Sequence, residues 1–152
     1  MYFIPILKDC KLLVVGDILE AEKDFYTGII GQTGCEDSII LINEYVPDDR
    51  VEYYFSACDV VVLPYESATQ SGIVQIAYGF NKPVIATSVG GLPDVVTEGK
   101  TGYLIKPFDS DAIADAVIKC FCNDQLNIFT ENIKSESERF SWDRINDIIR
   151  EL

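Results

Sequence analysis

The strongest constraint on this chain is the alternation of short, almost continuously apolar runs with segments whose apolar residues recur at helical spacing. The apolar runs occupy residues 11–16, 38–43, 59–64, 83–87 and 102–107. Strands that are apolar along their whole length are typical of parallel sheets covered on both faces, whereas a sheet with one wet face shows apolar and polar residues in alternation. The pattern therefore predicts buried parallel strands.

Amphipathic segments, two of them with a capping residue (Asp109 and Ser141), predict helices between and after these runs, over residues 19–29, 49–57, 73–80, 109–120 and 141–152. Strand–helix–strand alternation with short connections predicts a doubly wound, Rossmann-like α/β domain over residues 1–152, with a parallel sheet flanked by helices. The loops after the strands then share one edge of the sheet, where such folds bind ligands.

Composition excludes several classes of function. The formal charge of −13 repels phosphate backbones and anionic headgroups, so nucleic acid and membrane surfaces are not expected partners. Without any histidine, the chain has neither a Ser–His or Cys–His nucleophile pair nor a histidine-based zinc site. Its five scattered cysteines are read as free, mostly buried thiols, which indicates the reducing cytoplasm. No metal site is expected.

Polar, glycine-containing loops follow three of the predicted strands. Gly16 ends the first run, residues 65–72 form a hydroxyl-rich loop before a predicted helix, and residues 88–94 contain a pair of glycines. Each loop has an ordinary structural interpretation: turn chemistry at the glycines, and a capping box formed by Ser67 and Gln70. The functional interpretation is that free N–H groups at a helix start, with nearby hydroxyls, hold a phosphate or a sugar.

The order and spacing of these segments carry a family resemblance. The run VVVLPYESATQSGIVQIAYGFNKPVIATSVGGLPDVVTEGKTGYLIKPFD resembles the C-terminal, donor-binding domain of the retaining GT-B glycosyltransferases known as group 1 or family 4. KLLVVGD, IILINEYVPDDRVEYYFSACDVVVLP and the tail FSWDRINDIIREL are similar to the same family in the same order. The resemblance implies transfer of a sugar from a nucleotide-sugar donor to an acceptor, with no cofactor and no bound metal.

Carried over by position, the resemblance implies a donor site spread over several loops. Gly16, Tyr45 and Val46 would lie near the base and the ribose, and the start of the predicted helix at Ile73 would contact the sugar or the diphosphate. The paired glycines would line the adjoining floor. The implied donor-binding residues are Gly16, Tyr45, Val46, Glu66, Thr69, Gln70, Ser71, Gly72, Gly90 and Gly91. No catalytic residue is assigned.

The chain departs from the family's pattern at two glutamates spaced E-x7-E. Alignment through residues 82–84 places these positions at Ala68 and Ile76. The second glutamate of the family grips the ribose, which the side chain of Ile76 cannot do. Glu66 lies two residues before the first position and is a candidate substitute, and the ATQSG loop keeps its hydrogen-bonding capacity.

A second departure is that the family's domain opens with a further strand, a glycine-rich turn, and an arginine and a lysine that neutralise the diphosphate. That segment is expected to precede Met1, as is the acceptor-binding N-terminal domain, which would supply any membrane contact. None of the twelve basic residues falls in the three candidate loops. We therefore expect the chain alone to be inactive, because a cationic clamp is a large electrostatic contribution, and to self-associate weakly through an exposed edge.

Two alternatives to a glycosyltransferase donor domain remain open. The first is a non-catalytic GT-B-like binding or scaffold module, which the loss of both glutamates favours. The second is a sugar epimerase of the same fold. Polysaccharide or glycolipid biosynthesis in the cytoplasm is the setting that the family implies.

Overall fold

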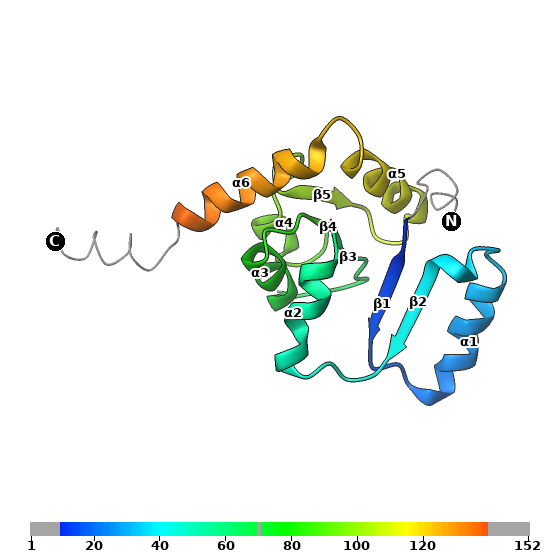
Figure 1. Ribbon diagram of the computed structural model, residues 1–152. Coiled ribbons are helices and arrows are strands. Elements are labelled where there is room, and N and C mark those ends of the chain that lie inside the picture. The colour runs from blue at the N-terminus through cyan, green and yellow to red at the C-terminus, as the bar shows by residue number, and fades with distance from the viewer. Residues whose placement is uncertain (1–9, 70, 140–152) are drawn as a thin grey trace. The chain divides into compact units, whose positions relative to one another are not determined.

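The computed structural model describes residues 10–69 and 71–139. The chain divides into two compact units, Met1–Tyr54 and Phe55–Leu152. Figure 1 shows the strands and helices of both units. Every described strand runs parallel to its neighbours, as the apolar runs predict.

The first unit contains a two-stranded parallel sheet. β1 (Leu12–Gly16) pairs residue for residue with β2 (Ile39–Asn43), so the two strands end at the same edge. The connection between them holds α1 (Glu20–Gly31) and the short 3-10 helix η1 (Glu36–Ser38). α2 (Asp48–Ala57) begins in this unit and ends in the second.

The second unit contains a three-stranded parallel sheet in the order β3 (Val61–Leu63), β4 (Val84–Thr87) and β5 (Gly102–Ile105). β4 is the central strand, and all four of its residues are buried. A strand with neighbours on both edges and cover on both faces has no solvent-exposed position. This explains why β4 is apolar without a break as far as Thr87.

Four of the described helices lie wholly within the second unit: α3 (Gly72–Gly79), α4 (Leu92–Val95), α5 (Ser110–Cys120) and α6 (Gln125–Arg139). α5 packs against β4 and β5, and α6 lies against α3 and α5. A cluster of buried side chains joins β3 and β4 to α3 and α4, and consists of Leu63, Val74, Ala77, Val84, Ala86, Leu92 and Val96. Two helices whose N-terminal ends follow β3 and β4 are thus fixed to the sheet by apolar packing.

Burial differs sharply between the units. None of the described residues 10–54 is buried, and Leu19, Phe25 and Ile29 are among the exposed apolar side chains of the first unit. The buried residues of the described chain all lie within 63–133. The hydrophobic core therefore belongs to the second unit.

The predicted α/β class and its parallel strands are confirmed. All five predicted strands are present, paired as one two-stranded and one three-stranded sheet. The predicted cap of α5 is also confirmed, since the Asp109 carboxylate accepts a hydrogen bond from the N–H of Ala112 at 2.9 Å. The helix predicted over residues 141–152 lies outside the described residues.

Two helices and one helix start differ from the sequence predictions. α4 occupies part of the segment predicted as a loop, and α6 was not predicted at all. The predicted capping box at Ser67 and Gln70 is wrong, because α3 begins only at Gly72 and its N-cap is Ser71. The polar loop after β3 is therefore longer than a capping box allows.

Candidate functional site

An open hollow of about 640 Å³ lies at the carboxyl end of β3. Its walls come from the segment that leaves β3 and enters α3, together with the first residues of that helix. The lining residues are Tyr65, Ser67, Ala68, Thr69, Ser71, Gly72 and Ile73. We refer to residues 65–69 and 71–72 as the pocket segment.

The pocket segment rests on the connection between β4 and α4. The hydroxyl of Thr87, a buried residue, donates to the carbonyl of Tyr65 at 2.6 Å. Further along, the N–H of Gly91 donates to the carbonyl of Thr69 at 2.9 Å. The main chain of the pocket segment is thus held at two points, by the last residue of β4 and by Gly91 in the connection that follows it.

Gly90 provides the closest approach between these two segments. Its φ is +52°, in the left-handed region, and a Cβ built on it would collide with the carbonyl oxygen of Ala68. Only glycine meets both requirements at low cost. Gly90, one of the paired glycines predicted as the floor of a site, therefore has a structural function as well, because it lets the main chain of the pocket segment pass close to its own at Ala68.

The N-terminus of α3 opens into the hollow with unpaired polar groups. Ser71 is the N-cap residue, yet its side chain makes no capping hydrogen bond. Its Oγ atom is buried and has no hydrogen-bond partner among the described residues. The N–H groups of Gly72 and Ile73 likewise have no partner in the described part of the chain.

A hydroxyl and two N–H groups at a helix N-terminus form a site suited to an anion or to a sugar hydroxyl. The partial positive charge of the helix end favours negative ligands, and the free N–H groups supply directed donors. No lysine or arginine is among the lining residues of the hollow. The described lining residues offer an anion main-chain dipoles and hydroxyls.

The structure brings several predicted site residues together. Thr69, Ser71 and Gly72 line the hollow, and Gly90 and Gly91 lie beneath the pocket segment without lining it. Glu66 is exposed and is not a lining residue. Gln70 lies outside the described residues.

Sequence reasoning did not assign Tyr65 or Ser67 to the site, although both belong to the loop that it singled out. It also missed the buried hydroxyl of Thr87. The signal for Thr87 was present in the sequence: a polar residue ends an otherwise apolar strand, where a hydroxyl finds a main-chain acceptor on the neighbouring strand.

The remaining predicted residues belong to the first unit. Gly16 is the last residue of β1, and Tyr45 and Val46 follow β2, at the carboxyl edge of the two-stranded sheet. Asn43, which sequence reasoning missed, accepts a hydrogen bond from the N–H of Ile18 at 2.7 Å and so joins the two strand ends. Tyr45 is 74% exposed. Contacts of Gly16, Tyr45 and Val46 with a base or ribose stay a prediction.

A second, smaller hollow of about 320 Å³ lies between β5 and α5. Its walls carry both signs of charge, with Glu98, Asp109 and Asp115 opposed by Lys106 and Lys119. The Glu98 carboxylate is already engaged, because it accepts a hydrogen bond from the N–H of Leu104. The first hollow has the unpaired donors that a ligand needs, and we take it as the candidate site.

The described helices include none that is both long and apolar enough to cross a membrane.

Comparison with known proteins gives consistent matches. The family described as "Glycosyl transferases group 1" matches residues 3–123. The D-inositol 3-phosphate glycosyltransferase of Corynebacterium glutamicum (strain R) is 32% identical over 123 residues, which are 80% of this chain and 29% of that protein.

Solved structures agree with the sequence match. The C-terminal domain of a glycosyl transferase group 1 family protein (LpcC) from Francisella tularensis superposes with a TM-score of 0.77 at 23% identity, over 86% of this chain and 69% of that one. Anabaena HepE in complex with UDP-glucose gives a TM-score of 0.71 at 25% identity, over 98% of this chain and 43% of that one.

The chain spans only about a third of the length of the curated relatives that it matches, for example 29% and 35% of two of them. Its fold, the order of its motifs and the family match over residues 3–123 agree with one another. The chain belongs to the group 1 glycosyltransferases and has the fold of their C-terminal GT-B domain.

Proposed function

We propose that this chain binds the nucleotide-sugar donor of a sugar transfer reaction, and that the pocket segment holds the donor's sugar or diphosphate. The observation that carries the proposal is the set of unpaired donors at the start of α3: the buried Ser71 Oγ and the N–H groups of Gly72 and Ile73. The Ser71 Oγ carries the most weight, because a buried side-chain polar atom without a partner is rare in folded proteins and its presence beside a hollow supports a ligand. The two N–H groups belong to exposed residues at a helix start and are available to the same ligand.

The similarity to HepE supports the class of ligand. HepE has been solved in complex with UDP-glucose. A nucleotide sugar offers both of the groups that the site can receive: phosphate oxygens for the N–H donors, and sugar hydroxyls for Thr69 and Ser71. With no cation among the lining residues, we infer that charge neutralisation of the diphosphate comes from elsewhere in the full-length enzyme.

For the whole protein we propose transfer of the sugar to an acceptor held by a further, N-terminal domain, in cytoplasmic polysaccharide or glycolipid biosynthesis. We expect no metal ion to be required. We also propose weak self-association of this chain, which static light scattering would detect as a mass that rises with concentration; a constant monomer mass contradicts it.

A thermal-shift panel tests donor binding. The chain is heated with UDP, GDP, ADP, CMP and representative sugar nucleotides at millimolar concentration. A ligand at 100 times its dissociation constant stabilises the folded state by about 2.7 kcal/mol, which gives a readable shift. We expect one base to stand out. If no nucleotide stabilises this chain, the panel is repeated with the full-length enzyme. If none stabilises that enzyme as well, the donor-domain proposal fails, and the non-catalytic module, favoured by Ala68 and Ile76, replaces it.

A double variant assigns the ligand group. Thr69→Ala with Ser71→Ala removes two hydroxyls from the pocket segment and leaves its main chain in place. We expect affinity for the sugar nucleotide to fall more than affinity for the free nucleotide. Ser88→Ala is the control, because Ser88 is exposed and does not line the hollow. Equal losses for the two ligands would show that the hydroxyls do not contact the sugar.

A further inference from the structure

The hydroxyl of Tyr78 lies at the opposite end of α3 from the proposed site. α3 runs from Gly72, which lines the hollow, to its last turn at Tyr78. α4 runs beside it from Gly91, which is hydrogen-bonded to the pocket segment, to Val95. The Tyr78 hydroxyl donates to the Val95 carbonyl at 3.2 Å. The two helices are therefore hydrogen-bonded to each other at one end. At the other end α3 continues directly from the pocket segment, and Gly91, which precedes α4, is hydrogen-bonded to that segment.

Tyr78 is linked by hydrogen bonds to Thr101 and, through it, to Thr97. Its oxygen lies 2.7 Å from Oγ1 of Thr101, which in turn accepts a hydrogen bond from the N–H of Thr97 at 2.9 Å. Because the single proton of Tyr78 goes to Val95, the Thr101 hydroxyl donates to Tyr78. Every polar group in this set of linked hydrogen bonds then has a partner. Burial raises the pKa of Tyr78, so the phenol keeps its proton and remains a donor.

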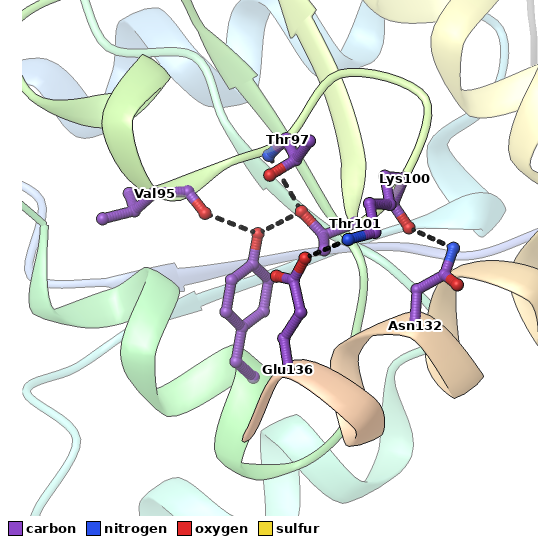
Figure 2. Close-up of polar contacts among 7 residues, drawn as sticks. Val95, Thr97, Lys100, Thr101, Asn132 and Glu136 are labelled. Carbon is purple, nitrogen blue, oxygen red and sulfur yellow. Dashed lines mark hydrogen bonds and ion pairs between the residues drawn. The ribbon is translucent and has the colours of Figure 1, made fainter. Parts of the chain in front are cut away.

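The loop that carries Thr101 is anchored from the side of α6. Figure 2 shows Lys100 paired with Glu136 and the Asn132 side chain bonded to the Lys100 carbonyl, at 2.7 and 2.9 Å. Thr101 itself is fully buried. Tyr78 is thus tied to a fixed point of the fold and not to a surface loop that could follow its movement.

We propose that Tyr78 is a positioning residue for the nucleotide-sugar site: with Thr101 it fixes the α3–α4 pair, and thereby the placement of the free donors at the start of α3. The inference rests on the proposed function of that site. The physical reason is that α3 has only eight residues, so a shift at its last turn reaches its first turn as a rigid-body movement. Donors displaced by a fraction of an ångström lose hydrogen-bond strength steeply.

Isosteric variants test this proposal. Tyr78→Phe keeps the ring and Thr101→Val keeps the shape of the side chain, but each removes one hydroxyl from the hydrogen-bonded set. Thr101→Ser keeps the hydroxyl at position 101. Thr130→Val is the matched control, since it removes a hydrogen bond from α6 to Asn81 without involving α4. Measurements are the dissociation constant for UDP-glucose, or for the panel member with the largest shift, and hydrogen exchange without ligand of the Val74 and Gly91 amides, which are hydrogen-bonded to the carbonyls of Ser71 and Thr69.

We expect Tyr78→Phe and Thr101→Val to weaken binding about tenfold, the effect of losing roughly one hydrogen bond to the ligand when the donors are displaced, and to accelerate exchange of the Val74 and Gly91 amides. Thr101→Ser should behave as wild type, and Thr130→Val should lower the melting temperature without changing affinity. If Tyr78→Phe lowers the melting temperature alone, with affinity and exchange unchanged, Tyr78 is merely structural and the inference is wrong. Failure of the wild-type protein to bind any nucleotide sugar instead overturns the proposed function, and the inference with it.

Discussion

At the scale of single residues, Gly90 shows how closely the site depends on the absence of a side chain. Its backbone is left-handed, and the carbonyl of Ala68 occupies the space that a Cβ would take. The site and the fold therefore share this residue. Any substitution that reshapes the pocket segment from below will also cost stability.

We predict that Gly90→Ala destabilises the chain more than Gly99→Ala. Gly99 also has a left-handed φ, of +70°, but a Cβ there meets no atom within 4 Å. Gly99→Ala therefore carries only the left-handed penalty of about 1–2 kcal/mol, while Gly90→Ala adds a main-chain collision. Urea unfolding of both variants measures the difference. Equal losses would mean that the approach to Ala68 relaxes freely.

Ionisation of Cys120 lowers the folding stability of the chain at alkaline pH. Burial raises the pKa of its thiol from 9.0 to about 12. A pKa that is raised in the folded state contributes stability fully below the unfolded pKa, and that contribution is lost as the pH rises towards the folded pKa. The window for Cys120 is therefore about pH 9 to 12.

We predict that Cys120→Ala flattens the loss of stability above pH 9, measured as the free energy of unfolding in urea at a series of pH values. Cys122→Ala, which removes a thiol at an exposed position, is measured alongside as a control for the loss of a cysteine. An identical slope for wild type and Cys120→Ala contradicts the assignment of this titration to Cys120.

At the scale of elements, α3 and α5 begin in contrasting ways. Asp109 caps α5 with a hydrogen bond to Ala112, whereas Ser71 stands at the N-cap of α3 and makes no capping bond. A serine or aspartate at the N-cap stabilises a helix mainly through such a bond. Asp109 therefore stabilises its helix, whereas Ser71 leaves the end of α3 without a side-chain cap.

We predict that Asp109→Ala destabilises the chain by about 1 kcal/mol, while Ser71→Ala leaves its stability unchanged or raises it, because it removes a buried hydroxyl without a partner among the described residues. Thermal unfolding without ligand measures both. The comparison Asp111→Ala, in the same first turn as Asp109 but not a cap, should have a small effect. A loss for Ser71→Ala as large as that for Asp109→Ala would show that Ser71 is an ordinary cap.

The elements that the sequence predicted are those with a continuous local signal. β4 is apolar throughout because all of its residues are buried, and α5 carries both a cap and an inner face. α6 has fifteen residues, but of its side chains only Phe129 and Ile133 are described as buried, too few to produce a clear apolar stripe. α4 is one turn long and contains Pro93, so no periodicity can reveal it.

The sequence predicted the loops of the candidate site but not the contacts between them. The glycines and hydroxyls after β3 and β4 were visible in the sequence, as was their resemblance to a donor site. The contact of Gly90 with Ala68, the bond from Thr87 to Tyr65 and the free Ser71 hydroxyl depend on how two crossover connections meet in space. The spacing of residues along the chain does not reveal which connections come into contact.

At the scale of the whole molecule, stability is unevenly distributed. The described part of the first unit has no buried residue, whereas the second unit holds the core. Hydrophobic burial is the main favourable contribution to folding, so a region without it opens at little cost.

We predict that hydrogen exchange of the native chain is faster in β1 and β2 than in β3, β4 and β5. The amides of β4, the central and fully buried strand, should exchange only at the rate of global unfolding. Exchange followed by mass spectrometry resolves the two units. Equal protection of both sheets would mean that the first unit is stabilised by something other than burial.

The central claim is that the start of α3 receives a nucleotide sugar. The most direct measurement is a titration of the isotope-labelled chain with UDP-glucose, or the best ligand of the panel, followed by amide chemical shifts. We predict the largest changes at Ser71, Gly72 and Ile73, with little change around the second hollow at Ala112 and Asp115. Binding that perturbs the second hollow and leaves the start of α3 unchanged would contradict the claim.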